Sequence, residues 1–256
     1  MKILTMIGGI LLLLQVRVLA TPVEDPQAKA MVTTMIEHLR GQINVSLHEM
    51  TVQRPTWSRT LKIKSWDDRK NKKVFLRILG PARDEGTCFL RLGYNLWSYL
   101  PNVEKVMKIP PSMMLQSWMG SDFTNDDLVK ESSYIDDYTH QILNEEKKEG
   151  KTVLQIELLP KPNAPVVWGK VVFWMWKEEL LPLAQSFYDE KGKLIKHMKF
   201  TEFKKMDGVL LPTVWDMENV AKGGEKTLLK LLTIDFNPTP PIADWIFSQQ
   251  HFTKKE

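Results

Sequence analysis

The sequence predicts a mainly β protein built on one strongly curved antiparallel sheet, a half-open barrel of about eleven strands. Two observations predict this fold. Segments with alternating apolar and polar residues follow one another from residue 45 to residue 236, with turn signals between them. Helical patterns occur only near the start of the chain and near its middle. A long antiparallel sheet loses its exposed edges by curling, and a barrel of this size tends to enclose a cavity.

The first expected element is a helix over residues 28–39. Gly41 follows this segment and is a helix stop signal. Four apolar residues recur at the spacing of one helix face, and these are Met31, Met35, Ile36 and Leu39. We expect this helix to plug or cover the opening of the curled sheet.

After this helix the apolar residues recur at every second position. Val45 and Leu47, for example, alternate with Ser46 and His48. Residues 166–176 are apolar on both faces, which is typical of a strand buried on both sides. The strand-like segments are 45–49, 61–64, 74–79, 87–92, 96–100, 103–109, 139–147, 152–159, 166–176, 183–188, 193–204, 213–219 and 227–236.

Residues 110–131 interrupt the strands and predict a helical lid. Pro111 can open a short helix, and Thr124 with Asp127 has the spacing of a capping box. Methionine side chains adapt to varied apolar shapes, so a Met-rich flap suits a cavity mouth. A plain core helix is the alternative interpretation, since such residues usually pack inside. The apolar residues of this segment are Met113, Met114, Leu115, Trp118, Met119 and Phe123.

The N-terminus predicts a secretory signal peptide over residues 1–20. Lys2 precedes the apolar run 7–14, and Val18-Leu19-Ala20 fits a cleavage site. An uncleaved anchor is the alternative. No cysteine follows the cleavage site, so we expect no lipid anchor there. The remaining residues, 21–256, are expected to form a single periplasmic domain.

Composition excludes several classes of protein. The 256 residues are 43% hydrophobic and 26% charged, which suits a globular domain with a substantial core. A net charge of +4 is too small to indicate a nucleic-acid partner. The single cysteine, Cys88, cannot form an internal disulfide, and its neighbours predict a small buried apolar side chain.

The sequence contains no recognised catalytic or metal-binding motif. Its five histidines are dispersed, without a zinc spacing, and no nucleophile elbow or phosphate loop occurs. Residues 122–126 resemble a calcium loop only faintly, because Asp127 occupies the position of the required glycine. A glycosidase pair of carboxylates stays open, because its spacing is spatial. We therefore expect no enzyme activity, metal or cofactor.

The chain resembles the LolA/LolB superfamily, and in particular the outer-membrane lipoprotein-sorting proteins. The resemblance runs from about Gln27 to the end. Thr21 stands where the anchored receptor class has its lipidated cysteine, so the chain is more similar to the unanchored carrier. The lid-locking arginine of the carrier has no matching position. The motifs that carry the resemblance are Pro81 with Gly86-Thr87, Trp97-Ser98-Tyr99-Leu100-Pro101, Lys105, Ile109-Pro110-Pro111-Ser112-Met113-Met114, Trp118-Met119-Gly120-Ser121-Asp122-Phe123 and Asp127-Leu128.

The resemblance implies a periplasmic carrier that shelters the acyl chains of a lipoprotein or lipid during transfer between membranes. A membrane transporter of the ABC or RND type is a possible partner. The alternative is a docking module of such a transporter, built on the same fold. The residues expected to form the cavity and its lid are Trp97, Tyr99, Ile109, Met113, Met114, Leu115, Trp118, Met119, Phe123, Leu154, Ile156, Phe173 and Met175.

Overall fold

The computed structural model describes residues 23–130 and 133–254, and the predicted signal peptide, residues 1–20, lies outside them. The described residues form one open sheet of 13 antiparallel strands. The predicted half-open barrel is therefore confirmed. Each segment expected to be a strand is one, so the predicted total of about eleven was too low.

The sheet consists of two runs of strands that are each consecutive in sequence, β1 to β6 and β7 to β13. The two runs join where the first strand of the chain pairs with the last. The order in the sheet is β6-β5-β4-β3-β2-β1-β13-β12-β11-β10-β9-β8-β7, so only the β1–β13 pair joins strands far apart in sequence. The strands are β1 Ile43–Arg54, β2 Trp57–Asp68, β3 Lys73–Gly80, β4 Cys88–Leu92, β5 Asn95–Leu100, β6 Lys105–Lys108, β7 Tyr138–Lys148, β8 Lys151–Pro160, β9 Lys170–Trp176, β10 Leu181–Tyr188, β11 Leu194–Met206, β12 Val209–Asn219 and β13 Lys226–Asp235.

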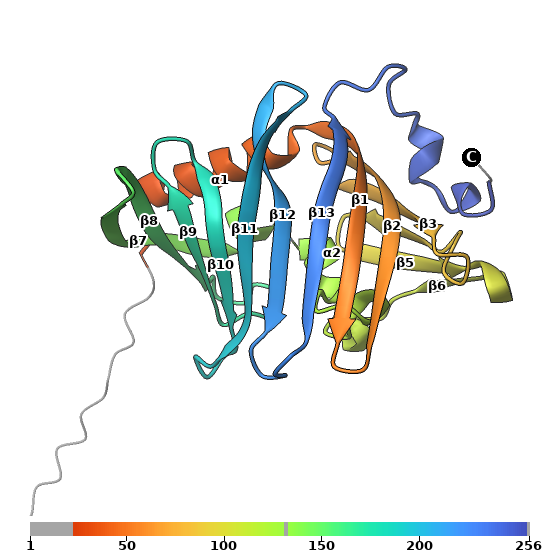
Figure 1. Ribbon diagram of the computed structural model, residues 1–256, viewed down its shortest axis with the longest axis horizontal. Helices are drawn as coiled ribbons and strands as arrows, with labels where there is room; N and C mark the ends of the chain where they lie inside the picture. The colour runs from red at the N-terminus through yellow and green to blue at the C-terminus, as the bar shows by residue number, and fades with distance from the viewer. Residues whose placement is uncertain (1–22, 131–132, 255–256) are drawn as a thin grey trace, which may run out of the picture.

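Helix α1 lies across the concave face of the sheet, behind the strands in Figure 1. Asp25 caps its N-terminus by accepting from the backbone N–H groups of Gln27 and Ala28, and Gly41 ends it at a φ of 62°. The remaining helices are short, and several of them lie in the mid-chain segment or next to it. The helices are α1 Pro26–Arg40, η1 Pro101–Val103, η2 Pro111–Met113, η3 Trp118–Gly120, α2 Asn125–Lys130, α3 Ser133–Asp136, η4 Asp244–Phe247 and η5 Gln249–His251.

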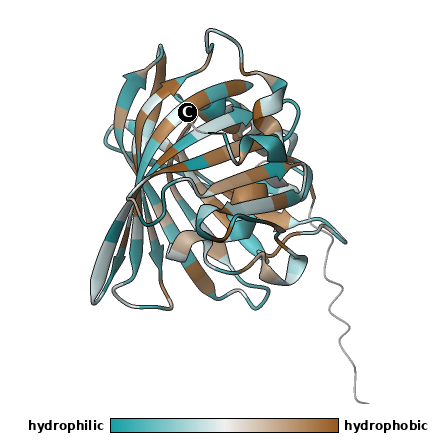
Figure 2. Ribbon diagram, turned by 90° about the vertical axis from the view of Figure 1, so that its right-hand side faces the viewer, coloured by the Kyte–Doolittle hydropathy of each residue, from teal (hydrophilic) through white to brown (hydrophobic). Residues whose placement is uncertain are grey.

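Two hydrophobic clusters lie on the concave face. One lies under α1, where Ala28, Val32 and Met35 pack against β8 and β9. The other lies under the mid-chain segment, where Trp118 and Val129 pack against β1 to β5. Figure 2 shows the apolar bands of the strands beneath these covering segments. The curled sheet thus has two separate covers, α1 over one half and residues 109–129 over the other.

A third cluster lies on the convex face, where the C-terminal segment covers β2 to β5. Phe247 and Phe252 pack there against Trp66, Phe75 and Tyr99. Arg77 fixes this segment by donating from Nη2 to the carbonyl oxygen of His251 at 2.7 Å. Cys88 is fully buried in the same cluster, as predicted.

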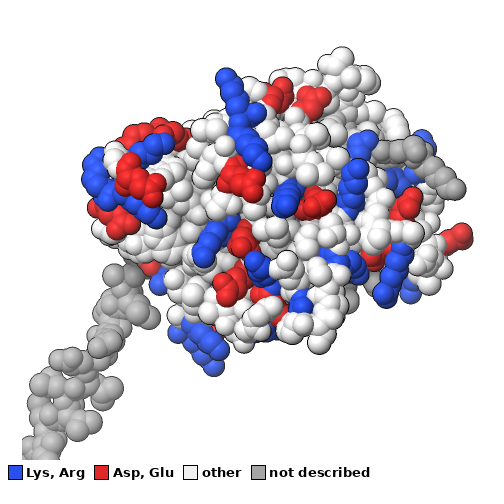
Figure 3. Space-filling view, viewed as in Figure 1, with Lys and Arg blue, Asp and Glu red and all other residues white. Residues whose placement is uncertain are grey.

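The convex face over β10 to β13 is a mixed polar surface. Lysine and arginine alternate there with aspartate and glutamate, and neither sign forms a large patch (Figure 3). In the described part of the chain, no helix combines the length and the apolar character needed to cross a membrane.

The predicted capping box at the start of α2 is confirmed. The backbone N–H of Thr124 donates to Asp127 Oδ2 at 2.7 Å, and the N–H of Asp127 donates to Thr124 Oγ1 at 3.2 Å. We expect Thr124→Ala to lower the free energy of unfolding by about 1 kcal/mol, because it removes this cap. Urea unfolding measures the difference. The exposed Thr201→Ala is the control and should change the free energy by less than about 0.5 kcal/mol; equal losses would contradict the capping role.

Candidate ligand-binding cavity

A cavity of about 200 Å³ lies on the concave face, between the sheet, the end of α1 and the mid-chain segment. Its wall comes from α1, from β1 to β5, from β10 to β13, from residues 118–128 and from Tyr134. Elements that are far apart in sequence therefore meet around one space. The curvature of the sheet produces this space, because the two covers fill only part of the concave face.

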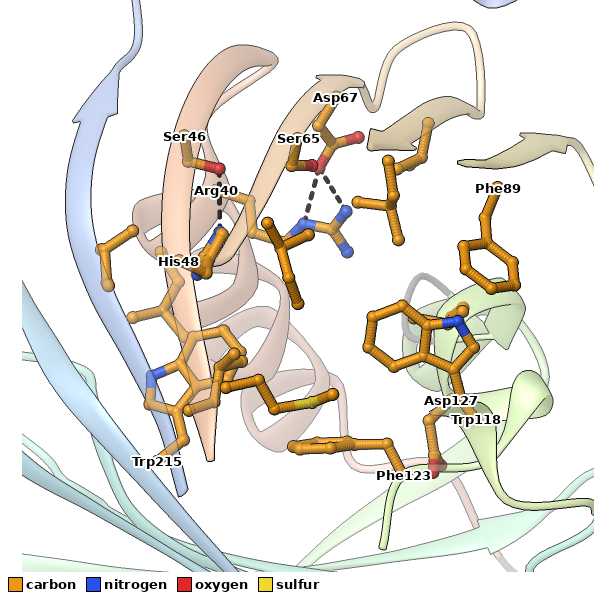
Figure 4. A pocket seen from close by; sticks show the side chains of 18 of the residues that line it. Arg40, Ser46, His48, Ser65, Asp67, Phe89, Trp118, Phe123, Asp127 and Trp215 are labelled. Atoms are coloured by element: carbon orange, nitrogen blue, oxygen red, sulfur yellow. Dashed lines mark hydrogen bonds and ion pairs between the residues drawn. The ribbon is translucent and has the colours of Figure 1, made fainter. Parts of the chain in front are cut away.

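One end of the cavity is apolar and lies beside the mid-chain segment. Trp118 packs edge-on against Phe89, with 5.4 Å between ring centroids, and only 4% of its surface is exposed. Trp215 on β12 forms the opposite wall and packs against Phe200 at 6.0 Å. Figure 4 shows Trp118, Phe123 and Trp215 around the same open space.

The other end of the cavity is polar and lies at the C-terminus of α1. Arg40 donates from Nε to Asp67 Oδ2 at 2.9 Å, and the two side chains form an ion pair. Ser46 Oγ and His48 Nε2 are hydrogen-bonded at 2.9 Å. Strand register groups the polar residues, since Ser46 pairs with Ser65 across β1 and β2. Figure 4 shows these side chains together, facing the apolar end.

His48 is neutral at pH 7 in this setting. Burial, together with the smaller effect of the nearby positive charge of Arg40, lowers its pKa from 6.5 to about 4. The neutral ring can accept one hydrogen bond and donate another. His48 therefore adds hydrogen-bonding capacity to the cavity without adding charge.

The low pKa of His48 makes stability depend on pH in a defined direction. The unfolded chain takes up a proton near pH 6.5 and the folded chain near pH 4, so stability falls as the pH drops through this interval. This group alone contributes roughly 3 kcal/mol to that loss. We expect His48→Gln to lose less stability than the wild type between pH 7 and pH 4, measured by urea unfolding. Identical losses would contradict the assignment.

A second ion pair joins the mid-chain segment to the sheet. Lys196 on β11 donates from Nζ to Asp127 Oδ2 at 2.8 Å, and only 4% of its side chain is exposed. The same ammonium lies 5.0 Å from the ring centroid of Trp168. Asp127 thus serves both the cap of α2 and the attachment of α2 to β11.

Two arginines that the sequence analysis did not single out hold residues 117–124 against the sheet. Arg54, at the end of β1, donates to Asp122 Oδ2 at 3.0 Å and to the carbonyl oxygen of Gly120 at 2.6 Å. Arg59 on β2 donates to the carbonyl oxygen of Met119. Asp122 also accepts from Thr227 Oγ1 at 2.7 Å. We call Arg54, Arg59, Asp122 and Thr227 the clamp.

The predicted lid residues lie over this cavity or beside it. Trp118 and Phe123 line it directly. Ile109, Met113, Met114 and Met119 pack against the hydrophobic cluster beneath the segment. Leu115 points outward and is 59% exposed. The ligand-binding roles of these residues remain predictions.

The other predicted site residues lie away from the cavity. Leu154, Ile156, Phe173 and Met175 are buried in the cluster under α1. Trp97 and Tyr99 belong to the convex cluster, under the C-terminal segment. Their ligand-binding roles are untested. The sequence pattern identified their apolar faces but not the element that covers each face.

In the ranges 23–130 and 133–254, no group of three or more His, Cys, Asp or Glu side chains is arranged to hold a metal ion. None of the curated proteins matches the sequence. One protein family, whose description reads "uncharacterized protein", matches residues 70–254. The chain belongs to this family.

Solved structures with the same fold are more informative than the family description. A DUF1329 family protein from Desulfovibrio piger is 24% identical and has a TM-score of 0.81, over 91% of this chain and 100% of the other. A domain assigned by name to the outer-membrane lipoprotein-sorting proteins, from Vibrio parahaemolyticus, is 24% identical with a TM-score of 0.76, over 89% and 99%.

A LolA superfamily protein from Nitrosomonas europaea is 21% identical and has a TM-score of 0.74, over 90% of this chain and 99% of the other. At these identities the likeness establishes the fold alone. The chain has the LolA-like fold, and the predicted resemblance is confirmed at this level.

Proposed function

We propose that this protein carries an acylated ligand, either a lipid or the acyl chains of a lipoprotein, through the periplasm between membranes. The observation that carries the proposal is the cavity on the concave face, which has an apolar end and a cover held by a few polar contacts. Moving an acyl chain from water into such a cavity is favourable by about 0.8 kcal/mol for each buried CH₂ group. The mechanism requires binding and release but no bond chemistry.

Release requires the cover to move, and the clamp suits that role. Its contacts are hydrogen bonds and ion pairs at the ends of strands, between Arg54, Arg59 and residues 119–122. Such contacts can exchange for water when the segment swings out, whereas the sheet behind them keeps its own hydrogen bonds. A membrane transporter that accepts or supplies the acyl chains is the partner that this role implies.

The experiment that tests carriage is native mass spectrometry of the full chain, purified from the periplasm of expressing cells. We expect bound species with the masses of lipids or lipopeptides. Leu231→Trp should remove them, because Leu231 lines the cavity and a larger ring fills it. The matched control is Leu232→Trp, since Leu232 is the next residue on β13, is absent from the cavity wall and is 39% exposed.

The two variants separate carriage from other uses of the fold. Bound lipid in the wild type and in Leu232→Trp, but not in Leu231→Trp, supports a carrier. A reproducibly empty wild-type protein would contradict carriage and favour a docking module. Equal lipid in all three proteins would place the lipid somewhere other than the cavity.

A further inference from the structure

The concave face changes from apolar to polar along two neighbouring strands. On β1 the inward residues run from Met50 to His48 and Ser46, and on β2 they run from Ile63 to Ser65 and Asp67. A ligand made of hydrocarbon alone would leave these buried polar groups without a hydrogen-bond partner, which is unfavourable. The polar end therefore calls for a ligand group that can form hydrogen bonds.

Several polar atoms at this end have no partner in the part of the chain that the structure describes. They include the buried atoms His48 Nδ1 and Asp67 Oδ1. Ser65 is 7% exposed, and it lines the cavity beside these two residues. Farther along the wall, Gln185 is 3% exposed and its buried Nε2 also lacks a partner among these residues. Donor and acceptor capacity are thus both available.

The charged side chains of the cavity wall are already engaged by other groups of the protein. The charged residues of the wall are two arginines and two aspartates, Arg40, Arg91, Asp67 and Asp127. Arg40 is paired with Asp67, Asp127 is paired with Lys196, and Arg91 donates to the carbonyl oxygen of Val129. A charged ligand group would lose its hydration here and would have to compete with these existing contacts for its partner, which is unfavourable. An uncharged group avoids this penalty.

We infer that the cavity takes an amphiphile with one long acyl chain and an uncharged head that carries hydroxyl groups, with the head at Ser65 and His48 and the chain toward Trp118. The inference rests on the proposed function, which it makes more specific. A hydroxyl group both donates and accepts, so it can satisfy Asp67 Oδ1 and the neutral His48 ring together. The orientation follows from the positions of the two ends of the cavity in Figure 4.

The test compares three ligands with the same sixteen-carbon chain: 1-palmitoylglycerol, palmitate and hexadecylamine. Their dissociation constants are measured on the full chain at pH 7 by displacement of the uncharged fluorescent probe N-phenyl-1-naphthylamine. We expect 1-palmitoylglycerol to bind at least about tenfold more tightly than either charged ligand, which corresponds to about 1.4 kcal/mol.

Two variants test the position of the head. Ser65→Ala and His48→Asn should each reduce the preference for 1-palmitoylglycerol and leave the affinity for palmitate nearly unchanged. The matched control is Ser186→Ala, because Ser186 is buried and bonded to His197, beside cavity-lining Gln185 and Phe187 but absent from the wall. It should keep the wild-type preference.

The outcomes distinguish the inference from the function on which it rests. Equal affinities for the three ligands, or an unchanged preference in both polar-end variants, would overturn the inference and leave carriage standing. Tighter binding of palmitate or hexadecylamine would overturn it as well. Failure of all three ligands to bind the wild-type protein would overturn both the inference and the carrier proposal.

Discussion

Arg54→Ala is expected to lower the free energy of unfolding by about 3 kcal/mol and to loosen residues 117–124. Asp122 lies opposite this arginine with only 2% of its side chain exposed. Removing the guanidinium leaves a buried carboxylate without its cation, which is strongly unfavourable. It also removes the bond to the carbonyl oxygen of Gly120. Urea unfolding and amide hydrogen exchange measure the two effects.

The control for Arg54→Ala is Arg83→Ala, because Arg83 is exposed in a turn. Its replacement should change stability by less than about 0.5 kcal/mol. The double variant Arg54→Ala, Asp122→Ala should lose less than the sum of the single variants, since the unpaired charge is gone. Additive losses would show that the two side chains do not act together, and the clamp would then not hold the cover.

Met175→Asp is expected to abolish cooperative unfolding altogether. Met175 is fully buried in the cluster under α1. An unpaired carboxylate there costs several kcal/mol, which is comparable to the whole stability of a typical domain. Circular dichroism during urea titration measures the transition. Met175→Leu is the control and should cost less than about 1.5 kcal/mol.

A folded Met175→Asp protein that had lost only its ligand would contradict the packing described here. It would instead support the placement of Met175 on a ligand-binding wall, as the sequence analysis expected. Comparison of Met175→Asp with Met175→Leu therefore decides whether Met175 on β9 is a core residue or a residue of the cavity wall.

The elements of this fold could be predicted from the sequence because their signals are local. The alternation along each strand, the stop at Gly41 and the capping residues Thr124 and Asp127 all act within a few neighbouring positions. The curled sheet followed from the unbroken succession of such strands. The total of 13 strands was underestimated, although the individual segments were recognised.

The site could be predicted only in part, because its contacts join residues far apart in sequence. Along β1, Ser46 and His48 face the cavity, and the apolar alternation gave no sign that the polar set points inward. The hydrogen-bonded residues Arg54 and Asp122 are 68 positions apart in sequence, and Asp122 and Thr227 are 105 positions apart. Such pairs depend on sheet order and on the path of the cover. Trp118 and Phe123 could be identified from the sequence because their apolar character is visible without knowledge of their contacts.

The most direct test of the central claim is photo-crosslinking with a 1-palmitoylglycerol analogue that carries a diazirine at the end of its acyl chain. We expect the label on peptides from residues 117–129, which lie at the apolar end of the cavity. Unlabelled 1-palmitoylglycerol should compete with it, and Leu231→Trp should lose the label. Labelling confined to the convex face, for example within residues 242–252, would contradict a ligand inside the curled sheet.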